Sequence, residues 1–443
     1  MLLNFNRYIR EIIKDRLTLY SLIGTSWRVL FAPFSLFLVA RNLSPEQQGF
    51  FFLFFSIAGM QQIIEAGFSH TIIQSVSHAM EGVRFENHLL KGDRENLCRI
   101  REAMRLGFAW FFLVCIFCIF VIYPAGLFII GKDHWDSYDV WLIPWSVFIF
   151  VFSLNVLLYP VNLFFEGILK LDFIYRNRLV IRIFESIFFV TSLYFGMGLY
   201  SVISFSLASL LMNSIVLFFP NIGQFREYIF KFPSKEYMKQ TFKWQLKVST
   251  VWCTGYFYWQ LPAVILFSWF GPVLSGQYNM TITLINSIKN IGQVFLTTKA
   301  ALIGYMRENG KFEEAYALYR KCSKSAYIIY FLGLFILLMV WFLLPDFVLW
   351  ERVLPMNQSL VLFFTQALSL VTVTQAVFAR CCKDEPFFWL SMFTNFGFPV
   401  VLLIAIQLIP NIWSIVLTFC IIHIIQFIWG CVRFKLLFGK RWI

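Results

Sequence analysis

Long apolar runs separated by short polar segments dominate the chain. A membrane-spanning helix needs about 20 apolar residues to cross a hydrocarbon core of about 30 Å. By that criterion the sequence predicts an all-α, polytopic membrane protein. A tight turn near Gly196 and Gly198 separates the fifth and sixth spans, and a re-entrant hairpin is the alternative for that pair. The twelve predicted spans lie near residues 17–40, 50–75, 106–130, 140–167, 179–199, 200–222, 248–270, 276–305, 324–346, 358–380, 387–408 and 411–432.

The second six spans repeat landmarks of the first six. Pro45 and Gly49 follow the first span, and Pro272 and Gly276 follow the seventh, in both cases 227 residues later. Repeated halves are typical of transporters that bind cargo near the membrane midplane, between the halves. The predicted domains around a central cavity are an N-terminal six-helix bundle (1–222), a cytoplasmic linker (223–247) and a C-terminal six-helix bundle (248–443).

Composition agrees with a membrane protein. The chain is 59% hydrophobic and 14% charged, with a mean hydropathy of +0.71, so it lacks the polar surface that a soluble protein of 443 residues needs. Its net charge of +13 does not indicate a nucleic-acid-binding protein, because 30 of its 37 Lys and Arg residues fall in the termini and in alternate segments between spans. The positive-inside rule therefore predicts that both termini are cytoplasmic, with the basic segments beside anionic membrane lipids.

The sequence indicates neither redox, metal nor nucleotide chemistry. Cys115 and Cys118 have the spacing of a redox pair, but they lie in an apolar run without a basic group to activate a thiol, which favours packing. The chain lacks a glycine-rich phosphate loop ending in Lys-Ser or Lys-Thr. We therefore predict a non-enzymatic protein without cofactor or metal. The candidate energy sources are the membrane potential, exchange of H⁺ or Na⁺, and consumption of the product.

Ionisable and amide side chains inside the spans are the candidate functional residues, because a charge at the membrane midplane costs about 2.5 to 3.5 kcal/mol. Polar residues of the eighth span recur at three- and four-residue spacing, which places them on one helix face bordered by Lys289. The repeat relates Lys289 approximately to Gln62, which shares a face with Glu65. Candidate cargo-binding residues are Arg28, Gln62, Asn286, Lys289, Asn290, Gln293 and Lys299. Candidate coupling or charge-partner residues are Glu65, His70 and His423.

These candidates also have structural interpretations. Amides in membrane helices join neighbouring helices without any ligand, and Lys299 is close enough to the cytoplasmic end to extend to the interface. The histidines His70 and His423 are more simply explained as interior residues with satisfied hydrogen bonds. Glu65, the one acidic candidate, is the natural counter-ion of Lys289 if that lysine is purely structural. If both polar faces point inward instead, they line a cationic cavity between the halves.

Short motifs next to the spans carry a resemblance to a known family. They are residues 40–50 (Ala-Arg-Asn-Leu-Ser-Pro-Glu-Gln-Gln-Gly-Phe), 65–68 (Glu-Ala-Gly-Phe) and 92–95 (Gly-Asp-Arg-Glu). They resemble the polysaccharide-transporter branch of the MOP (multidrug/oligosaccharidyl-lipid/polysaccharide) superfamily, which contains the Wzx-type O-antigen flippases. The resemblance extends in pattern over essentially all 443 residues. Glu65 departs from it, because the family often has aspartate there.

The resemblance implies two six-helix bundles whose cavity opens alternately to either side of the bacterial inner membrane. The implied cargo is an undecaprenyl-diphosphate-linked oligosaccharide, moved to the periplasmic leaflet for O-antigen and lipopolysaccharide biosynthesis. A polysaccharide polymerase and chain-length proteins are the implied partners. Buried Arg28, Lys289 and Lys299 suit the diphosphate of such a cargo.

Other functions are left open by the sequence. A cation-coupled drug or metabolite antiporter of the same superfamily is one alternative, although an exporter of organic cations should have an acidic cavity. A non-transporting membrane component of polysaccharide assembly is another, but a scaffold has no need of buried cations in both halves. A glycan polymerase is a third, and it should carry a large external loop, which this chain lacks.

Overall fold

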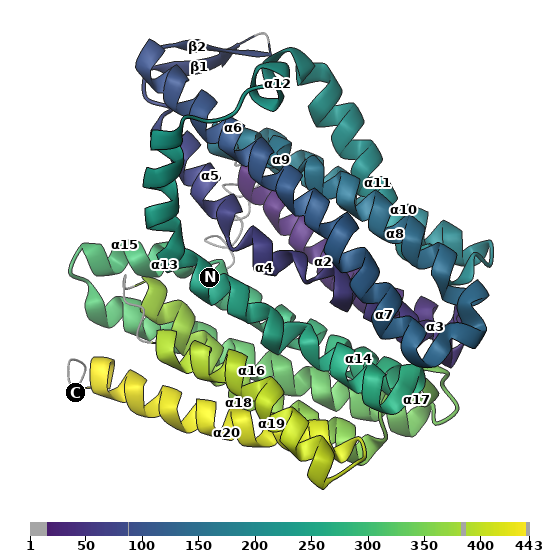
Figure 1. Ribbon diagram of the computed structural model, residues 1–443. Helices are drawn as coiled ribbons and strands as arrows, with labels where there is room; N and C mark the ends of the chain where they lie inside the picture. Colours follow the sequence, from purple (N-terminus) through teal and green to yellow (C-terminus); the bar gives the residue numbers. More distant parts are fainter. Residues whose placement is uncertain (1–15, 87, 382–386, 440–443) are drawn as a thin grey trace. The chain divides into compact units, whose positions relative to one another are not determined.

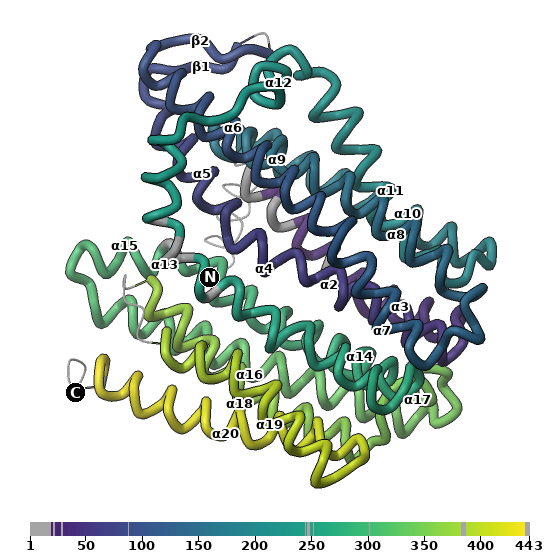
Figure 2. Tube along the Cα trace, viewed as in Figure 1, coloured from purple at the N-terminus to yellow at the C-terminus, as the bar shows by residue number. Residues whose placement is uncertain are grey.

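The described chain forms two compact units. The computed structural model describes residues 16–86, 88–381 and 387–439. Unit 1 runs up to Phe31 and resumes over Phe54–Cys253, whereas unit 2 comprises Ala32–Leu53 and the chain from Thr254 onward. Figures 1 and 2 show the helices of each unit. Both chain termini, which we predict to be cytoplasmic, lie outside the described residues.

The boundaries of these units differ in kind from those of the predicted domains. The predicted domains follow the sequence repeat, with boundaries at residues 222 and 247, whereas the units follow contacts within the fold. The compact units instead place the predicted linker in unit 1, and they place Ala32–Leu53 in unit 2. Helix α2 (Arg16–Asn42) therefore begins in unit 1 and ends in unit 2, and helix α13 (Lys235–Trp259) does the same.

The number of membrane crossings follows from helix lengths. Within the described residues, eight helical stretches are long and apolar enough to cross a membrane, or nine if the bent pair Pro45–Glu65 and Phe68–His78 is one span. Two of the eight, Arg94–Gly167 and Trp252–Glu308, have 74 and 57 residues. At about 1.5 Å per residue each is far longer than a bilayer is thick, so each contains two crossings. Addition of the charged helix α10 (Leu171–Tyr194) gives the predicted twelve, six in each half of the sequence.

Unit 1 is built on large aromatic side chains. Trp141, Trp145 and Phe164 are fully buried, and a glycine at position 126 lets one helix approach the Trp145 ring closely. Helix α10 packs along α11, which in turn packs on α8 (Figure 1). The turn at Gly196 joins α10 to α11, as the sequence predicts. Besides α10 and the parts of α2 and α13, the unit contains the end of α3 (Pro45–Ala58), α4 (Gln61–Glu65), α5 (Phe68–His78), β1 (Val83–Glu86), β2 (Leu89–Gly92), α6 (Arg94–Phe117), α7 (Tyr123–His134), α8 (Tyr138–Leu157), α9 (Tyr159–Gly167), α11 (Ser201–Met212) and α12 (Ile222–Ile229).

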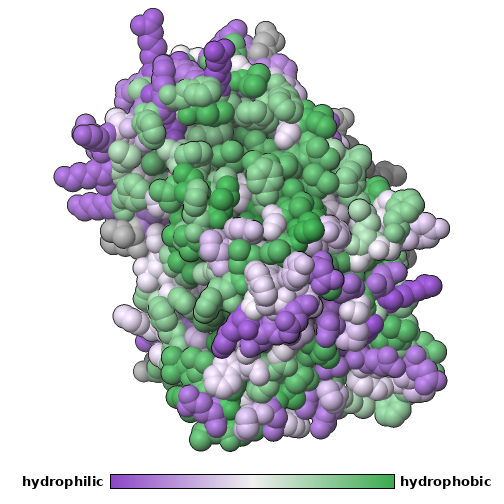
Figure 3. Space-filling view, turned by 45° about the vertical axis from the view of Figure 1, so that its right-hand side comes forward, coloured by the Kyte–Doolittle hydropathy of each residue, from purple (hydrophilic) through white to green (hydrophobic). Residues whose placement is uncertain are grey.

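A β-hairpin that the sequence analysis did not predict stands at one end of unit 1. Strands β1 and β2 pair antiparallel, with Val83 opposite Gly92. The side chain of Asp93 then accepts a hydrogen bond from the backbone N–H of Asn96 (3.0 Å) and caps the first turn of α6. His88 at the hairpin tip contacts Asn221 through Nδ1 (2.7 Å). Figure 3 shows long hydrophilic side chains gathered at this end, next to broad apolar stretches of surface.

Unit 2 is a bundle of long helices with a continuous apolar core. Helix α14 packs on α16 and α18, and α20 packs on α18 and α19 (Figure 1). Leu266, Tyr330, Leu362, Phe398 and Ile422 lie in the core and are fully buried or nearly so. The helices from Thr254 onward, after the last residues of α13, are α14 (Leu261–Thr297), α15 (Ala300–Glu308), α16 (Phe312–Leu343), α17 (Leu349–Arg352), α18 (Met356–Cys381), α19 (Phe388–Leu408) and α20 (Trp413–Phe434).

The repeated landmarks meet inside unit 2. Helix α14 is kinked at Gly271 (φ 78°, ψ 179°), directly before Pro272, and this kink divides the seventh crossing from the eighth. Gly49 of α3 lies against the backbone of Pro272, and a Cβ on Gly276 would stand 3.0 Å from the backbone nitrogen of Gly49. The residues that the sequence pairs as repeats are therefore neighbours at a close crossing of α3 and α14. Glycine permits such a crossing because no side chain separates the two backbones.

Candidate functional site

Lys289 is the most deeply buried cation among the described residues. It lies on α14 with only 3% of its surface exposed. Its Nζ donates a hydrogen bond to Oε1 of Gln366 on α18 (2.7 Å) and lies 5.8 Å from the centre of the Trp259 ring. Among the described residues, no carboxylate is within ion-pair distance of this nitrogen. The amine is thus held by one neutral amide and one aromatic face.

The Gln366 side chain lies beside Tyr258, whose hydroxyl begins a chain of hydrogen bonds to α20. That hydroxyl lies 2.8 Å from Nε2 of His423, and Nδ1 of His423 lies 2.9 Å from the carbonyl oxygen of Phe419. A carbonyl only accepts, so Nδ1 carries the proton and Nε2 accepts from Tyr258 in the neutral imidazole. The donors of Tyr258 and His423 therefore both point toward the backbone of Phe419, and such aligned bonds polarise one another.

The other polar residues of the predicted α14 face are more accessible than Lys289. Asn290 is exposed, and Asn286 and Gln293 are half-buried. Lys299 is half-buried where α14 gives way to α15. It is ten residues from Lys289, about 15 Å along the helix, so the structure does not bring these two lysines together. The role of all four residues in cargo binding stays a prediction.

In unit 1, Glu65 lies at a break in the second predicted span. Helix α4 ends at Glu65, and Ala66 (φ 52°) and Gly67 (φ 70°) adopt left-handed conformations before α5 begins. The two pieces are bent by 48°. The half-buried Glu65 carboxylate accepts a hydrogen bond from Ser69 Oγ across the break (2.6 Å). This carboxylate therefore sits where a membrane helix is interrupted, as at many ion and substrate sites of transporters.

Helix α13 supports this break. Gln245 donates a hydrogen bond from Nε2 to the carbonyl oxygen of Ala66 (2.7 Å) and accepts one from the hydroxyl of Thr71. The thiol of Cys253 donates to the carbonyl of Ile63 (3.1 Å). The backbone groups released by the interrupted helix are thus taken up by side chains of α13, which is how a membrane protein tolerates such a break.

The remaining predicted residues of unit 1 lie apart from these contacts. Gln62 is exposed on α4. His70 is exposed on α5 and its Nε2 pairs with Nε2 of Gln74 (2.9 Å). Arg28 belongs to α2, but its side chain lies outside the described residues. Their predicted roles are not changed by these placements.

Three residues of the Lys289 network were missed by the sequence analysis. Gln366, Tyr258 and Trp259 lie in predicted spans, but outside the polar faces predicted for the second and eighth spans. A polar face was detectable around Gln366, because Thr365, Gln366, Ser369 and Thr372 follow one another at short spacing in an otherwise apolar run. Trp259 is 57% exposed and lies at the end of α13.

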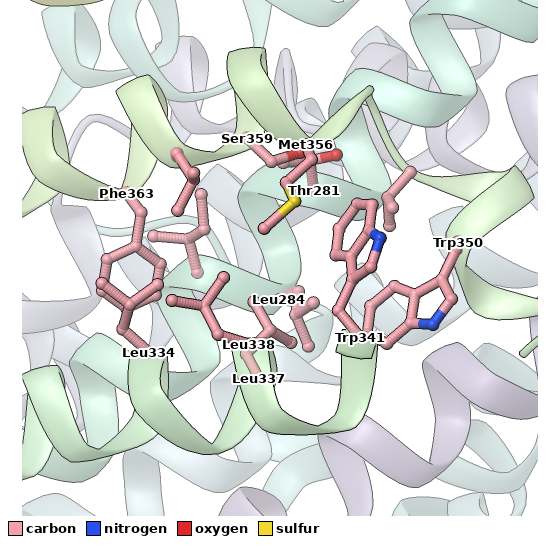
Figure 4. A pocket seen from close by; sticks show the side chains of 13 residues that line it. Thr281, Leu284, Leu334, Leu337, Leu338, Trp341, Trp350, Met356, Ser359 and Phe363 are labelled. Atoms are coloured by element: carbon pink, nitrogen blue, oxygen red, sulfur yellow. The ribbon is translucent and has the colours of Figure 1, made fainter. Parts of the chain in front are cut away.

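A separate apolar pocket opens in unit 2 between α14, α16, α17 and α18. Trp341 and Trp350 stack at one end of it, with ring centres 4.4 Å apart, and Phe363 lies at the other end (Figure 4). Its two hydroxyls are already engaged with the backbone of Leu354, since Thr281 accepts from the N–H and Ser359 donates to the carbonyl. The lining is almost entirely apolar, so the pocket suits hydrocarbon better than an anion.

Comparison with solved structures identifies the fold. An inward-facing MATE family multidrug resistance transporter of the MOP superfamily matches with a TM-score of 0.62 and 15% identity over 95% of both chains. The MATE multidrug transporter DinF-BH, solved as a complex, matches with a TM-score of 0.62 and 14% identity over 97% of this chain and 96% of its own. A MOP superfamily transporter from Pyrococcus furiosus, described as having a binding pocket of reverse polarity that suggests a different function, matches with a TM-score of 0.53 and 15% identity over 95% of both.

The likeness is one of structure. No protein-family model matches the chain, and no curated protein sequence matches it. At this level of identity the comparisons establish the fold of MOP superfamily transporters for the chain. They are in line with the superfamily predicted from the sequence motifs.

Proposed function

We propose that this protein is an alternating-access transporter that flips a lipid-linked oligosaccharide across the bacterial inner membrane. The cargo is an undecaprenyl-diphosphate-linked unit for a surface polysaccharide such as O-antigen, carried from the cytoplasmic to the periplasmic leaflet. Lys289 contacts the diphosphate, Arg28 is a further candidate for that contact, and Lys299, about 15 Å away along the helix, would meet another part of the cargo. The exposed amides of α14 and α4 meet sugar hydroxyls, and Glu65 is the candidate for ion coupling.

The observation that carries this proposal is the buried amine of unit 2. Helices α14, α18, α19 and α20 contain no aspartate or glutamate, yet α14 keeps Lys289 in the interior. A buried cation is costly and usually marks a pathway or a ligand. A diphosphate offers it charge-assisted hydrogen bonds, whereas an organic cation would be repelled. The charge of unit 2 therefore favours an anionic cargo.

The transporters of like fold support the proposal in a limited way. Two of the three described above are multidrug transporters by name, and the third is described by a binding pocket of reverse polarity. An exporter of organic cations needs carboxylates, whereas unit 2 buries a lysine. The same fold can thus serve cargoes of opposite charge, and the buried residues select between them.

Flipping in proteoliposomes tests this proposal. Labelled undecaprenyl-diphosphate oligosaccharide is incorporated, and its exposure to an external enzyme is compared with that in empty liposomes. We expect protein-dependent exposure, a loss of at least tenfold in Lys289→Ala, and normal rates in Lys311→Ala, which changes an exposed lysine between α15 and α16. Normal flipping by a well-inserted Lys289→Ala protein would remove Lys289 from the diphosphate site.

The second candidate is a cation-coupled drug or metabolite antiporter. Glu65 favours it, because a half-buried carboxylate at a helix break is suited to bind a proton, a sodium ion or an organic cation. If the intact protein leaves the labelled lipid unexposed but exports a cationic dye down an imposed ion gradient, the antiporter replaces the flippase. Loss of that export in Glu65→Gln would then assign the site.

A further inference from the structure

The ammonium of Lys289 has fewer partners than it can use. It carries three N–H donors. One is taken by Gln366 Oε1, and the Trp259 ring lies on another side. Gln366 is itself only 1% exposed, so its oxygen has no competing solvent. Among the described residues, Gln366 is therefore the single strong hydrogen-bond acceptor that retains the amine inside unit 2.

That acceptor is a neutral group among neutral neighbours. Gln366 lies beside Tyr258, whose hydroxyl donates to His423, and His423 donates to the backbone of Phe419. The amine is therefore held by a group without net charge, in contrast to a carboxylate.

We propose that Gln366 is a positioning residue that withdraws the Lys289 amine from the cargo and so promotes cargo release. This inference rests on the proposed function, in which Lys289 binds an anionic diphosphate. Gln366 Oε1 and the phosphate oxygens of the cargo then compete for the same amine.

A neutral partner suits this exchange better than a charged one or none. A carboxylate at 366 would form a buried ion pair, which is costly to separate once formed, and cargo could not recruit the amine. An apolar residue at 366 would leave the amine to the cargo alone, and cargo would leave slowly. An amide binds the amine less tightly than a carboxylate but more tightly than an apolar residue. A diphosphate attracts the amine more strongly than the amide does, and the amine returns to the amide after the cargo has left.

Chemical modification of the cargo-free protein tests whether Gln366 retains the amine. The purified full chain is treated with an isotope-labelled acylating reagent, and modification of Lys289 is followed by mass spectrometry. We expect Gln366→Leu to raise the rate about fivefold or more, and Gln366→Glu to lower it. Gln358→Leu is the matched control, since it changes another buried glutamine of α18. Equal rates in all four proteins would overturn the proposal.

Transport then tests the effect on release. In the flipping assay, Gln366→Leu should lower both the half-saturating cargo concentration and the maximal rate, each about fivefold, whereas Gln366→Glu should raise the half-saturating concentration. A merely structural role would lower the maximal rate alone, and that result would overturn the proposal. The modification assay needs no cargo, so it tests the role of Gln366 separately from the proposed function. Failure of the proposed function is recognised by a lack of flipping in the unaltered protein. Gln366→Asn supplies a milder variant if Gln366→Leu does not fold.

Discussion

The close crossing of α3 and α14 makes the stability of unit 2 sensitive to single methyl groups. A Cβ added at Gly49 would stand 2.6 Å from the carbonyl carbon of Pro272 and 2.7 Å from its Cα. Unbonded carbon atoms prefer about 3.5 to 4.0 Å, so the two helix backbones would have to separate by about 1 Å. Overpacking of this kind costs about 1 to 3 kcal/mol, and backbone atoms cannot rotate away as a side chain can. We expect Gly49→Ala to lie at the upper end of that range.

Two glycines at this crossing and one elsewhere provide a graded series of alanine variants. At Gly276 the nearest atoms would be 3.0 and 3.1 Å away, so Gly276→Ala needs a smaller shift and should cost about 1 kcal/mol. Gly223 of α12 has nothing within 4 Å of the added atom, and alanine there should be neutral or stabilising by up to about 1 kcal/mol. Unfolding temperatures of the purified variants in one detergent should rank Gly223→Ala highest and Gly49→Ala lowest. A Gly49→Ala protein as stable as Gly223→Ala would refute the close crossing.

Three further substitutions address the two candidate sites. Tyr258→Phe removes the hydroxyl that donates a hydrogen bond to His423 and leaves a buried imidazole nitrogen without a donor. The free energy of unfolding, measured by denaturant titration, should fall by about 1 to 3 kcal/mol. An unchanged value would argue against the hydrogen-bond chain. Gly67→Ala places an alanine in a left-handed conformation, at a cost of about 1 to 2 kcal/mol, and brings its Cβ against the Trp252 ring. The unfolding temperature should fall, and a second change, Trp252→Ala, should restore part of the loss. Lys289→Met removes the cost of a buried charge, about 2.5 to 3.5 kcal/mol, but leaves the Gln366 acceptor unpaired at a cost of about 1 to 3 kcal/mol. Thermal stability should therefore be kept or raised while flipping is lost. A marked loss of stability would make Lys289 a structural residue.

The spans and their pairing into two halves could be predicted because they depend on local information. About 20 apolar residues are sufficient to identify a crossing, and a repeated Pro and Gly mark equivalent turns. The end of the seventh span was predicted at Gly271-Pro272, where the structure has a kink, and the turn at Gly196 was predicted from its closely spaced glycines. The β-hairpin over Val83–Gly92 was not predicted, since its register depends on contacts such as that of His88 with Asn221, 133 residues away.

The candidate site was predictable only in part, because helical spacing fixes a face but not its surroundings. Lys289 and Asn290 are neighbours in sequence, about 100° apart around the helix, and the first is buried whereas the second is exposed. Lys289 was expected beside the polar face, and its actual partner Gln366 is 77 residues away on α18. The helix break after Glu65 was likewise invisible, because Ala66 in a left-handed conformation is held there by Gln245 of α13.

The repeat has thus kept its scaffold and changed its chemistry. At the crossing, equivalent glycines still meet, and the backbone geometry requires them. At the approximately equivalent positions Gln62 and Lys289 no such constraint exists, and the two units differ. Unit 1 has an exposed amide beside a broken helix, whereas unit 2 has a buried cation bonded to a neutral amide. In the proposed function, these unequal sites let one unit retain the charge that selects an anionic cargo. The break at Glu65, supported by α13, is then the separate element proposed to bind a coupling ion.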